Sequence, residues 1–232
     1  SFSPPEIIYV DSASVDGSSE IARRLGAKVI ISNGPGLNAA KGRNAGWRAV
    51  SSEDVLFLDG DTVLDPGFAE KAKGALRAPE VAAVWGNRRE MFPRKNFFHR
   101  VCDLDWTYPY GESEYFGGDV LIRRKVLEEV GGYDESLKAG EEPEMCGRIR
   151  AKGYKIFHID VPMTLHDIRM NSWREYWRRA MRSGYAYAEV TSRFPQSAPP
   201  SWKRKPRHNI CKAFLFAGLL LTGTGGLFCY QS

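Results

Sequence analysis

Residues 54–68 read DVLFLDGDTVLDPGF, and this stretch indicates how the chain folds. Residues 54–59 form an apolar run that ends in an aspartate, as expected of a strand covered on both faces of a parallel sheet. The sequence Asp59-Gly60-Asp61 follows at once, and the glycine permits a tight turn that brings two carboxylates together. Such a pair can hold Mg²⁺ or another hard cation through oxygen ligands, although Asp-Gly is also an ordinary surface turn.

Similar apolar runs alternate with helical patterns on both sides of this stretch. The sequence predicts strands at residues 6–12, 27–32, 54–59 and 81–86, and helices at 17–26, 38–50 and 66–77. Such an alternation forms right-handed β-α-β units, so we expect an α/β domain with a mostly parallel sheet and flanking helices. Ligands of such sheets bind at the carboxyl ends of the strands, where Asp11 and Asp59 are expected. Residues 87–113 lack a clear period and are expected to form a long functional or mobile connection.

The composition is that of a globular protein whose charge is unevenly distributed. Of the 232 residues, 43% are hydrophobic and 26% are charged, which excludes the collagen-like, low-complexity and disulfide-knit classes. The four cysteines form no C-x-x-C pair, so a reducing compartment is the default expectation. The net charge of +5 divides into −4 for residues 1–168, +4 for 169–193 and +5 for 203–212. A uniformly basic nucleic-acid binder is therefore excluded.

Three further features of the sequence contribute candidate functional residues at the same edge of the sheet. Glu141 and Glu142 open a predicted helix, where acids suit the helix dipole but could also present a general base. Gly118 precedes Asp119 and lets the backbone approach a ligand closely. His166 ends an extended run; a lone histidine is usually structural, yet together with the carboxylates it could complete a metal site.

The C-terminal part of the chain carries a different pattern. Residues 169–194 predict a helix with an aromatic face beside an arginine stripe, which suits either a membrane interface or a core helix with a solvated basic face. Residues 195–212 form a linker that is first rich in serine and proline and then basic. Residues 213–232 carry no charge and predict a membrane span of about 27 Å; the alternative is an apolar helix buried in a soluble core or against a partner. The basic residues before this segment favour a cytoplasmic position for the preceding domain.

Taken in order, these stretches resemble the catalytic domain of a family 2 glycosyltransferase with the GT-A fold. The order runs EIIYVD, GRNAG, DVLFLDGDTVLDPGF, FGGDVLIRRKVLEEVGGYDE, GEEPEMCGRIRAKGYKI and then His166. The resemblance covers about residues 6–168, and its specificity comes from the order and spacing of pieces that are individually weak. It implies a GT-A-like catalytic domain over residues 1–168, a nucleotide-sugar donor, a Mg²⁺ or Mn²⁺ ion and an inverting transfer to a hydroxyl acceptor.

The resemblance assigns residues to the donor and to the metal. Asp11 matches the aspartate that contacts the nucleobase, and Arg43 falls in the R-N-x-G stretch near the donor phosphates. Asp59 and Asp61 match the D-x-D pair that binds the donor, with Asp61 the better metal ligand. His166 matches a histidine that often joins the metal or diphosphate site.

On the acceptor side, Glu142 matches the catalytic base, which is usually an aspartate in the family. The resemblance also assigns Glu141, Gly118 and Asp119 to the acceptor side, where the acceptor-side loop approaches the sugar. The longer side chain of Glu142 must be accommodated by the backbone or by the position of the acceptor. Family members also begin with an apolar strand and a helix that would precede Pro4, so we expect an N-terminally incomplete domain that binds donor poorly on its own.

Together these features predict a metal-dependent glycosyltransferase at the cytoplasmic face of the cell membrane. A UDP-sugar is the favoured donor, the acceptor could be lipid-linked, and no nucleic acid is expected as a partner. Two alternatives remain open: a nucleotidyltransferase, which also uses paired carboxylates and a metal, and an inactive glycosyltransferase-like scaffold on the membrane. Residues 12–20 lack the basic, glycine-rich phosphate loop of a nucleotidyltransferase, and the presence of Asp59, Asp61, Glu142 and His166 together argues against the scaffold.

Overall fold

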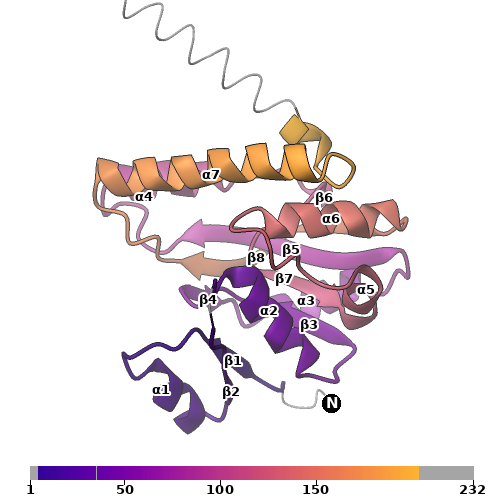
Figure 1. Ribbon diagram of the computed structural model, residues 1–232, viewed down its shortest axis with the longest axis horizontal. Helices are drawn as coiled ribbons and strands as arrows, with labels where there is room; N and C mark the ends of the chain where they lie inside the picture. The colour runs from indigo at the N-terminus through magenta and orange to yellow at the C-terminus, as the bar shows by residue number, and fades with distance from the viewer. Residues whose placement is uncertain (1–4, 35, 204–232) are drawn as a thin grey trace, which may run out of the picture.

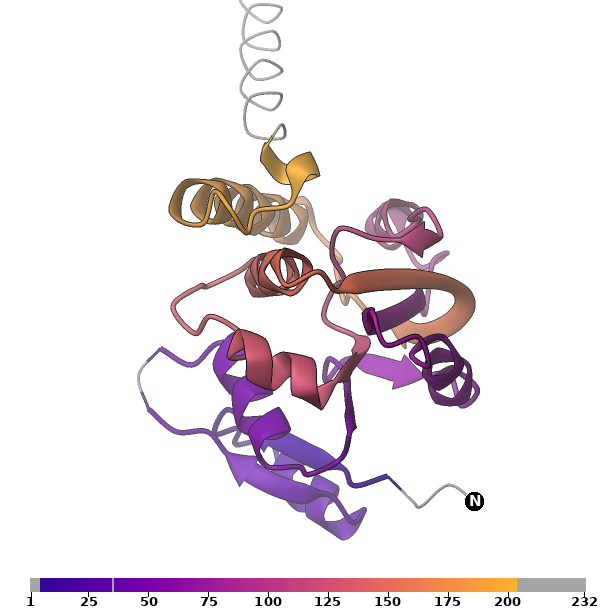
Figure 2. The ribbon, with the colours of Figure 1, turned by 90° about the vertical axis from the view of Figure 1, so that its right-hand side faces the viewer.

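The computed structural model describes residues 5–34 and 36–203 and has an α/β architecture, with helices on both sides of its larger sheet (Figures 1 and 2). The strands are β1 (Ile8–Asp11), β2 (Lys28–Ile31), β3 (Asp54–Phe57), β4 (Thr62–Leu64), β5 (Val81–Glu90), β6 (Gly111–Glu112), β7 (Val120–Arg123) and β8 (Lys155–His166). The helices are α1 (Ser18–Arg24), α2 (Ala39–Arg48), α3 (Phe68–Ala75), α4 (Phe97–Asp105), α5 (Arg124–Val130), α6 (Glu141–Ala151) and α7 (Trp173–Arg193).

The predicted strands correspond to β1, β2, β3 and β5, and the predicted helices near the start of the chain correspond to α1, α2 and α3. Residues 87–113 differ from the expectation of a connection without regular structure. They continue β5 to Glu90 and then form α4 and β6. α4 is only nine residues long, from the residue after its cap at Asn96 to its end at Asp105, so its helical pattern in the sequence is short.

Side chains that cap helices fix where several elements begin. Asn38, Asn96 and Ser172 precede α2, α4 and α7, and each accepts a hydrogen bond from the backbone N–H three residues further on, at 2.9, 3.0 and 3.3 Å. At the start of α7 the Glu175 carboxylate also reaches back to the N–H of Asn171 at 2.8 Å. The two side chains of this first turn therefore satisfy backbone donors reciprocally.

The strands form two sheets, so the expected mostly parallel sheet is wrong. β1 and β2 pair in parallel by themselves, while the larger sheet has the order β3-β7-β5-β8-β4, with β6 beside β8. Among the described strands of the larger sheet, β5 and β8 alone pair in parallel. A parallel neighbour needs a crossover connection, whereas β7 enters the sheet from a loop at the same edge at which β3 and β5 end. It must therefore run antiparallel to both.

This mixed order gathers several strand ends at one edge of the sheet. Phe57 pairs with Val120 in the β3–β7 register, and Glu90 pairs with His166 in the β5–β8 register. Thr62 at the start of β4 also pairs with His166. β3, β5 and β8 thus end where β4 and β7 begin, and the side chains at these positions become neighbours.

The main hydrophobic core packs α2, α3, α5 and α6 against the larger sheet, with Phe68, Leu127 and Met145 fully buried. Asn44 of α2 connects this core to the turn after α5. Its side-chain amide donates to the Tyr133 carbonyl at 2.8 Å, and its side-chain oxygen accepts from the Tyr133 N–H at 3.0 Å. Such a reciprocal pair fixes both the position and the rotation of α2 on the body of the molecule.

α7 lies at the end of the molecule opposite β1 and β2, next to α6 (Figures 1 and 2). It accounts for the helix predicted within residues 169–194, and its Ala186 and Val190 are buried with Trp202 of the following segment. No helix in the part of the chain that the structure describes has both the length and the apolar character to cross a membrane. The apolar segment predicted at 213–232 lies outside the described residues, as does the basic end of the linker.

Gly147 of α6 marks a close approach to the segment after α7. A Cβ at Gly147 would overlap the backbone of Ser197, whereas nothing lies within 4 Å of a Cβ at Gly74 in α3. We predict that Gly147→Ala lowers the free energy of unfolding by about 1–3 kcal/mol, because the two backbones must separate. Gly74→Ala, the matched control, should raise it by about 0.5–1 kcal/mol. Urea unfolding of both variants measures the difference, and equal stabilities would disprove the close packing of this segment on α6.

Candidate active site

The candidate active site is built where β3 ends and β7 begins. The backbone N–H of Asp59 donates to Oδ1 of the buried Asp119 at 2.8 Å, as the antiparallel register of these strands allows. Gly118 provides the space, because a Cβ at this position would overlap the Asp59 carboxylate. The close approach expected at Gly118 is thus made by a carboxylate of the protein itself.

Arg88, near the end of β5, binds both of these carboxylates. Its Nη2 donates to Asp119 Oδ2 at 2.6 Å and to Asp59 Oδ2 at 3.2 Å, and its Nε donates to Asp119 Oδ2 at 3.1 Å. The Thr164 hydroxyl adds a hydrogen bond to the same Asp119 oxygen at 2.8 Å. Arg88 is not among the residues predicted from the sequence, because the strand predicted at residues 81–86 ends before it. Extending that strand by two residues would have put Arg88 at the edge where Asp59 was expected.

Arg43 of α2 joins three carboxylates that are far apart in the sequence. Its Nη2 donates to Asp59 Oδ1 at 2.8 Å, and its Nη1 donates to Glu141 Oε1 at 2.9 Å and to Glu142 Oε1 at 3.0 Å. The guanidinium also lies 5.5 Å from the centroid of the Tyr133 ring. Where the resemblance implied donor phosphates near Arg43, the structure places carboxylates, so the predicted base Glu142 is linked to Asp59 through one guanidinium.

The carboxyl groups around Arg43 have different acidities. Burial raises the pKa of Glu142 to about 7, and this effect outweighs the opposing attraction of Arg43. Burial also acts to raise the pKa of Asp59, but Arg43 and Arg88 together hold that pKa below its usual value. Near neutral pH the site therefore contains one carboxyl that exchanges a proton and another that stays ionised.

Asp61 and His166 form a second group at the same edge. His166 Nε2 lies 3.2 Å from Asp61 Oδ2, and this contact lowers the pKa of Asp61. The His166 side chain is 8% exposed, whereas that of Asp61 is 47% exposed. A carboxylate oxygen suits Mg²⁺ or Mn²⁺, and imidazole is a common metal ligand. The pair thus fits a cation that takes its remaining ligands from water and from a phosphate group.

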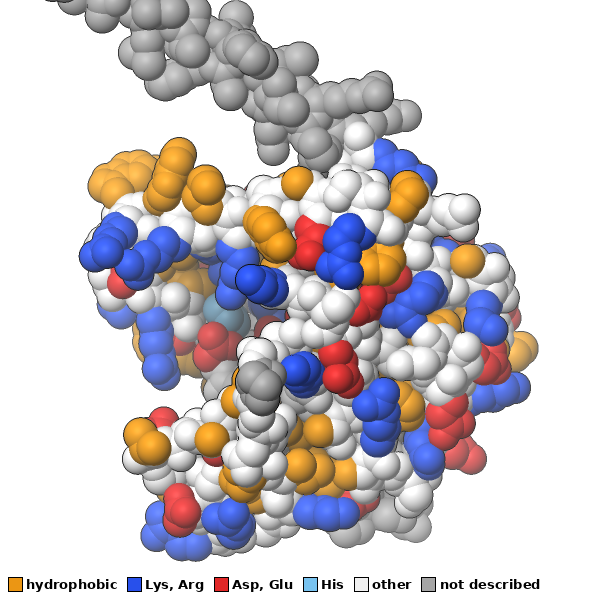
Figure 3. Space-filling model, in the orientation of Figure 1, with side chains coloured by type: hydrophobic (Ala, Val, Ile, Leu, Met, Phe, Trp, Pro, Cys, Tyr) orange, Lys and Arg blue, Asp and Glu red, His pale blue; other side chains and the backbone are white. Residues whose placement is uncertain are grey.

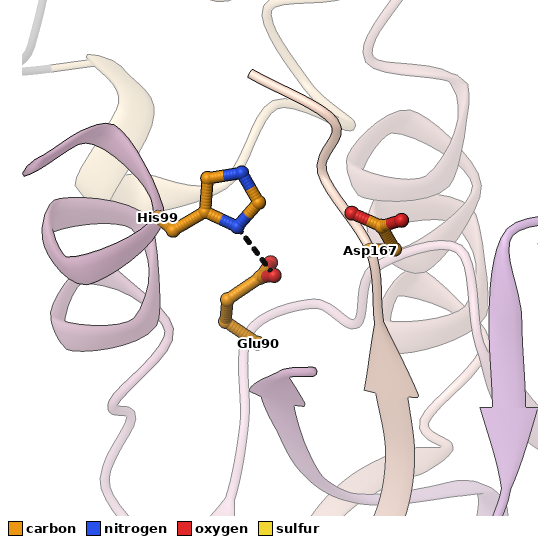
Figure 4. Close-up of side chains that lie close together, drawn as sticks. All are labelled: Glu90, His99 and Asp167. Carbon is orange, nitrogen blue, oxygen red and sulfur yellow. Dashed lines mark hydrogen bonds and ion pairs between the residues drawn. The ribbon is translucent and has the colours of Figure 1, made fainter. Parts of the chain in front are cut away.

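A neighbouring group could also be considered as a metal site. Glu90, His99 and Asp167 each offer a ligand atom within 4.8 Å of the others, and Figure 4 shows Glu90 and His99 facing each other beside Asp167. The Glu90 carboxylate, however, already contacts His99 Nδ1 at 2.7 Å and accepts from the N–H groups of Phe92 at 3.0 Å and Ile168 at 3.2 Å. Because these hydrogen bonds hold β5, α4 and the segment after β8 together, we assign this group a structural role.

An aromatic cavity of about 200 Å³ opens beside the carboxylates. Most of its wall is aromatic and includes Trp85, Trp106, Tyr108 and Tyr115. Arg88 and Asp119, two charged residues of the site, also line it. The Trp106 ring packs edge-on against His166, with 5.0 Å between the ring centroids. Figure 3 shows a hollow beneath α7 in which acidic and histidine side chains are visible. Aromatic walls with a few fixed polar groups are typical of a site for a small molecule.

Asp11 lies apart from this arrangement. It ends β1 in the two-stranded sheet, and its carboxylate accepts the N–H of Ser14 at 2.8 Å. The structure thus brings together most of the predicted site residues at one edge: Arg43, Asp59, Asp61, Gly118, Asp119, Glu141, Glu142 and His166. The role of Asp11 at the nucleobase stays a prediction.

Two family models match the sequence. Glycosyl transferase family 2 matches residues 1–131, and the N-terminal domain of galactosyltransferase matches residues 98–172. Among curated proteins, the pre-mycofactocin glycosyltransferase of Mycobacterium tuberculosis is 26% identical over 173 residues, which cover 69% of this chain. The same match covers 36% of the relative, so this chain spans little more than a third of its length.

Solved structures share the fold. The mannosyltransferase PcManGT from Pyrobaculum calidifontis, in complex with GDP-Man and Mn²⁺, gives a TM-score of 0.63 at 22% identity, covering 88% of this chain and 59% of that chain. S. aureus TarS in complex with UDP-GlcNAc gives a TM-score of 0.59 at 14% identity, covering 80% of this chain and 57% of that chain. At these identities the likeness establishes the fold, a GT-A fold, and leaves the donor open.

The Asp61–His166 pair leads to a test that separates the two groups of potential metal ligands. We predict that Asp61→Asn weakens Mn²⁺ binding by about tenfold or more, because the amide oxygen carries no charge to hold the cation. Asp167→Asn is the matched control, since it removes a carboxylate from the neighbouring group and should leave the affinity unchanged. Electron paramagnetic resonance of free Mn²⁺, titrated into the full chain with UDP or GDP, measures both affinities. The opposite ranking would place the ion at Glu90, His99 and Asp167.

Proposed function

The chain belongs to glycosyl transferase family 2, and we propose that it transfers a sugar from a nucleotide-sugar donor to a hydroxyl acceptor with inversion at the anomeric carbon. The observation that carries this proposal is the link from Asp59 through Arg43 to Glu142, a carboxyl that is only 16% exposed and whose pKa is raised to about 7. A general base works best when its pKa lies near the operating pH and when it is held beside the reacting groups. The raised pKa of Glu142 meets the first condition, and its link through Arg43 to Asp59 supports the second.

In this reaction the acceptor oxygen bonds to the anomeric carbon while the bond from that carbon to the diphosphate oxygen breaks. The electron pair leaves with the nucleoside diphosphate, and Glu142 takes the proton of the acceptor hydroxyl. Arg43 is a positioning residue, because it holds Glu142 at 3.0 Å and Asp59 at 2.8 Å with two different nitrogens. Positioning and fixed charges supply the rate, without a covalent intermediate on the protein.

Asp61 and His166 would hold the divalent ion that the family resemblance implies. When bound, the ion neutralises the charge that develops on the leaving diphosphate. The Mn²⁺ and GDP-Man in the complex of PcManGT support this assignment, as does the open side of Asp61. TarS is bound to UDP-GlcNAc, and a UDP-sugar stays the donor that we propose for this chain.

We also propose that the enzyme works at the membrane surface, with its catalytic domain on the cytoplasmic side. Trp173 and Trp177 of α7 are 66% and 67% exposed, although tryptophan is usually largely buried in a soluble protein. Exposed tryptophans beside arginines are typical of helices that lie in a membrane interface. The basic residues at 203–212 and the uncharged sequence at 213–232 support the same location.

The role of Glu142 can be tested by replacing its carboxylate. We predict that Glu142→Gln lowers kcat by about 10²–10⁴-fold, because the amide cannot accept the acceptor proton. The matched variant Glu142→Asp keeps the carboxylate and should retain more activity than Glu142→Gln, while the KM for the donor should change little in either. Steady-state transfer assays on the full chain give these values. Equal kcat for the Gln variant and the natural chain would remove Glu142 from this role.

The raised pKa of Glu142 also predicts the pH dependence. Below about pH 7 the carboxyl is protonated and cannot act as a base, so kcat/KM should fall about tenfold per pH unit on the acid side and level off above pH 7. The residual activity of Glu142→Gln should lack this acid limb. A midpoint in the ordinary range of an exposed glutamate would contradict the assignment.

A further inference from the structure

The surface of α7 carries two parallel stripes at intervals of four residues. One stripe is apolar and largely exposed, and consists of Trp173, Trp177, Met181 and Tyr185. The other is basic and consists of Arg174, Arg178 and Arg182. Figure 3 shows the apolar side chains along the upper rim of the molecule, with Lys and Arg side chains directly beneath them and above the hollow of the candidate site.

Beneath the basic stripe, the structure contains a cavity of about 310 Å³ between α7 and the segment that follows β8. Four arginines line it, namely Arg169, Arg178, Arg179 and Arg182, against a single acid, Glu175. The Glu175 carboxylate is occupied by the hydrogen bond to Asn171 at the helix start. The cavity therefore has a strong excess of positive charge.

The arginines of this cavity have few anionic partners of their own. Arg169 contacts Asp167 at 3.4 Å, whereas neither Arg178 nor Arg182 takes part in an ion pair with any residue that the structure describes. Four guanidinium groups that line one cavity with a single carboxylate leave an excess of positive charge there, and an anion offsets that excess. Guanidinium groups bind phosphate oxygens especially well, because their N–H groups match the spacing of two oxygens.

Arg179 connects this cavity to the candidate active site. It lines both the arginine cavity and the aromatic cavity. Its guanidinium lies 5.9 Å from the centroid of the Trp106 ring, which is also contacted by Arg88 at 5.8 Å and packs edge-on against His166. A molecule held by the arginines can therefore extend along Trp106 towards the sheet edge that carries the carboxylates.

We propose that the arginine cavity binds the phosphate group of a lipid-linked acceptor. This inference rests on the proposed function and deepens it by naming the acceptor class: a sugar joined to a lipid through phosphate. The lipid chain would lie with the apolar stripe of α7 in the membrane interface, the phosphate among Arg169, Arg178 and Arg182, and the sugar in the aromatic cavity with a hydroxyl directed at Glu142. The order of these surfaces, from apolar rim to basic cavity to the aromatic cavity lined by Arg88 and Asp119, follows the order of lipid, phosphate and sugar in such a molecule.

The test measures binding of dodecyl glucosyl phosphate, a sugar joined to an alkyl chain through a phosphodiester, to the full chain in neutral detergent micelles by isothermal titration calorimetry. We predict that Arg178→Gln and Arg182→Gln each weaken binding by about tenfold, the loss expected for one hydrogen-bonded charge pair. Arg174→Gln is the matched control, because it removes the same charge from the same helix outside the cavity and should have little effect. Equal losses in all three variants, or no binding to the natural chain, would overturn the proposal.

Two further arms identify the source of the phosphate. Phosphatidylglycerol at equal charge presents a phosphodiester on a bulk membrane lipid, and inorganic phosphate presents the anion without a chain. We predict that both bind at least about tenfold more weakly than dodecyl glucosyl phosphate, because neither places a sugar in the aromatic cavity, and equal binding of either would overturn the proposal of a lipid-linked sugar phosphate acceptor. Donor hydrolysis without acceptor gives a separate readout of the proposed function, and Arg174→Gln, which lies outside the cavity, should hydrolyse donor at the rate of the natural chain. Absence of hydrolysis in the natural chain would count against the proposed function, while the binding results would still decide the role of the cavity.

Discussion

The Asp59 carboxylate joins the separate parts of the site. One of its oxygens accepts from Arg43 at 2.8 Å and the other from Arg88 at 3.2 Å, while its backbone N–H donates to Asp119. α2, β3, β5 and β7 therefore meet at one residue. The position of this carboxylate depends on the absence of a side chain at Gly118, because a Cβ there would overlap the carboxylate. With Asp59 bound to one nitrogen of Arg43, the other nitrogen is left to hold the two glutamates at the start of α6.

The charge of this arrangement is unbalanced in a way that bears on the chemistry. Two guanidinium groups face five carboxyl groups, those of Asp59, Asp61, Asp119, Glu141 and Glu142. Burial makes it costly to ionise all of them, and the raised pKa of Glu142 expresses that cost. Asp61 is the most exposed carboxylate of the five and is therefore the one most open to an incoming diphosphate. A divalent cation at this point reverses the local sign, so charge balance supports the proposed metal independently of the family resemblance.

Local sequence signals were sufficient to predict the positions of site residues that directly follow a strand or open a helix. Asp59 and Asp61 come after an apolar run, and Glu142 lies in the first turn of α6, so each could be placed from its own neighbours. The partners of Arg43 could not be predicted in this way, because its contact with Glu141 spans 98 residues and depends on how Asn44 docks α2 on the rest of the molecule. The antiparallel direction of β7 was equally inaccessible. The direction of a strand is set by the edge at which the chain enters the sheet, and this edge cannot be predicted from a short stretch of sequence.

α7 shows what periodicity predicts and what it leaves undecided. The spacing of its residues predicts an aromatic face and a basic stripe, but an ordinary core helix would turn the aromatic face inward. The structure instead buries Ala186 and Val190 and leaves Trp173 and Trp177 in contact with solvent. Burial of apolar surface contributes about 25 cal/mol per Å², so these side chains forgo a stabilisation that a membrane interface would supply. If they are immersed there, the depth of one helix sets the level of the arginine cavity at the lipid phosphates, because Arg178 and Arg182 lie on the same helix as these tryptophans.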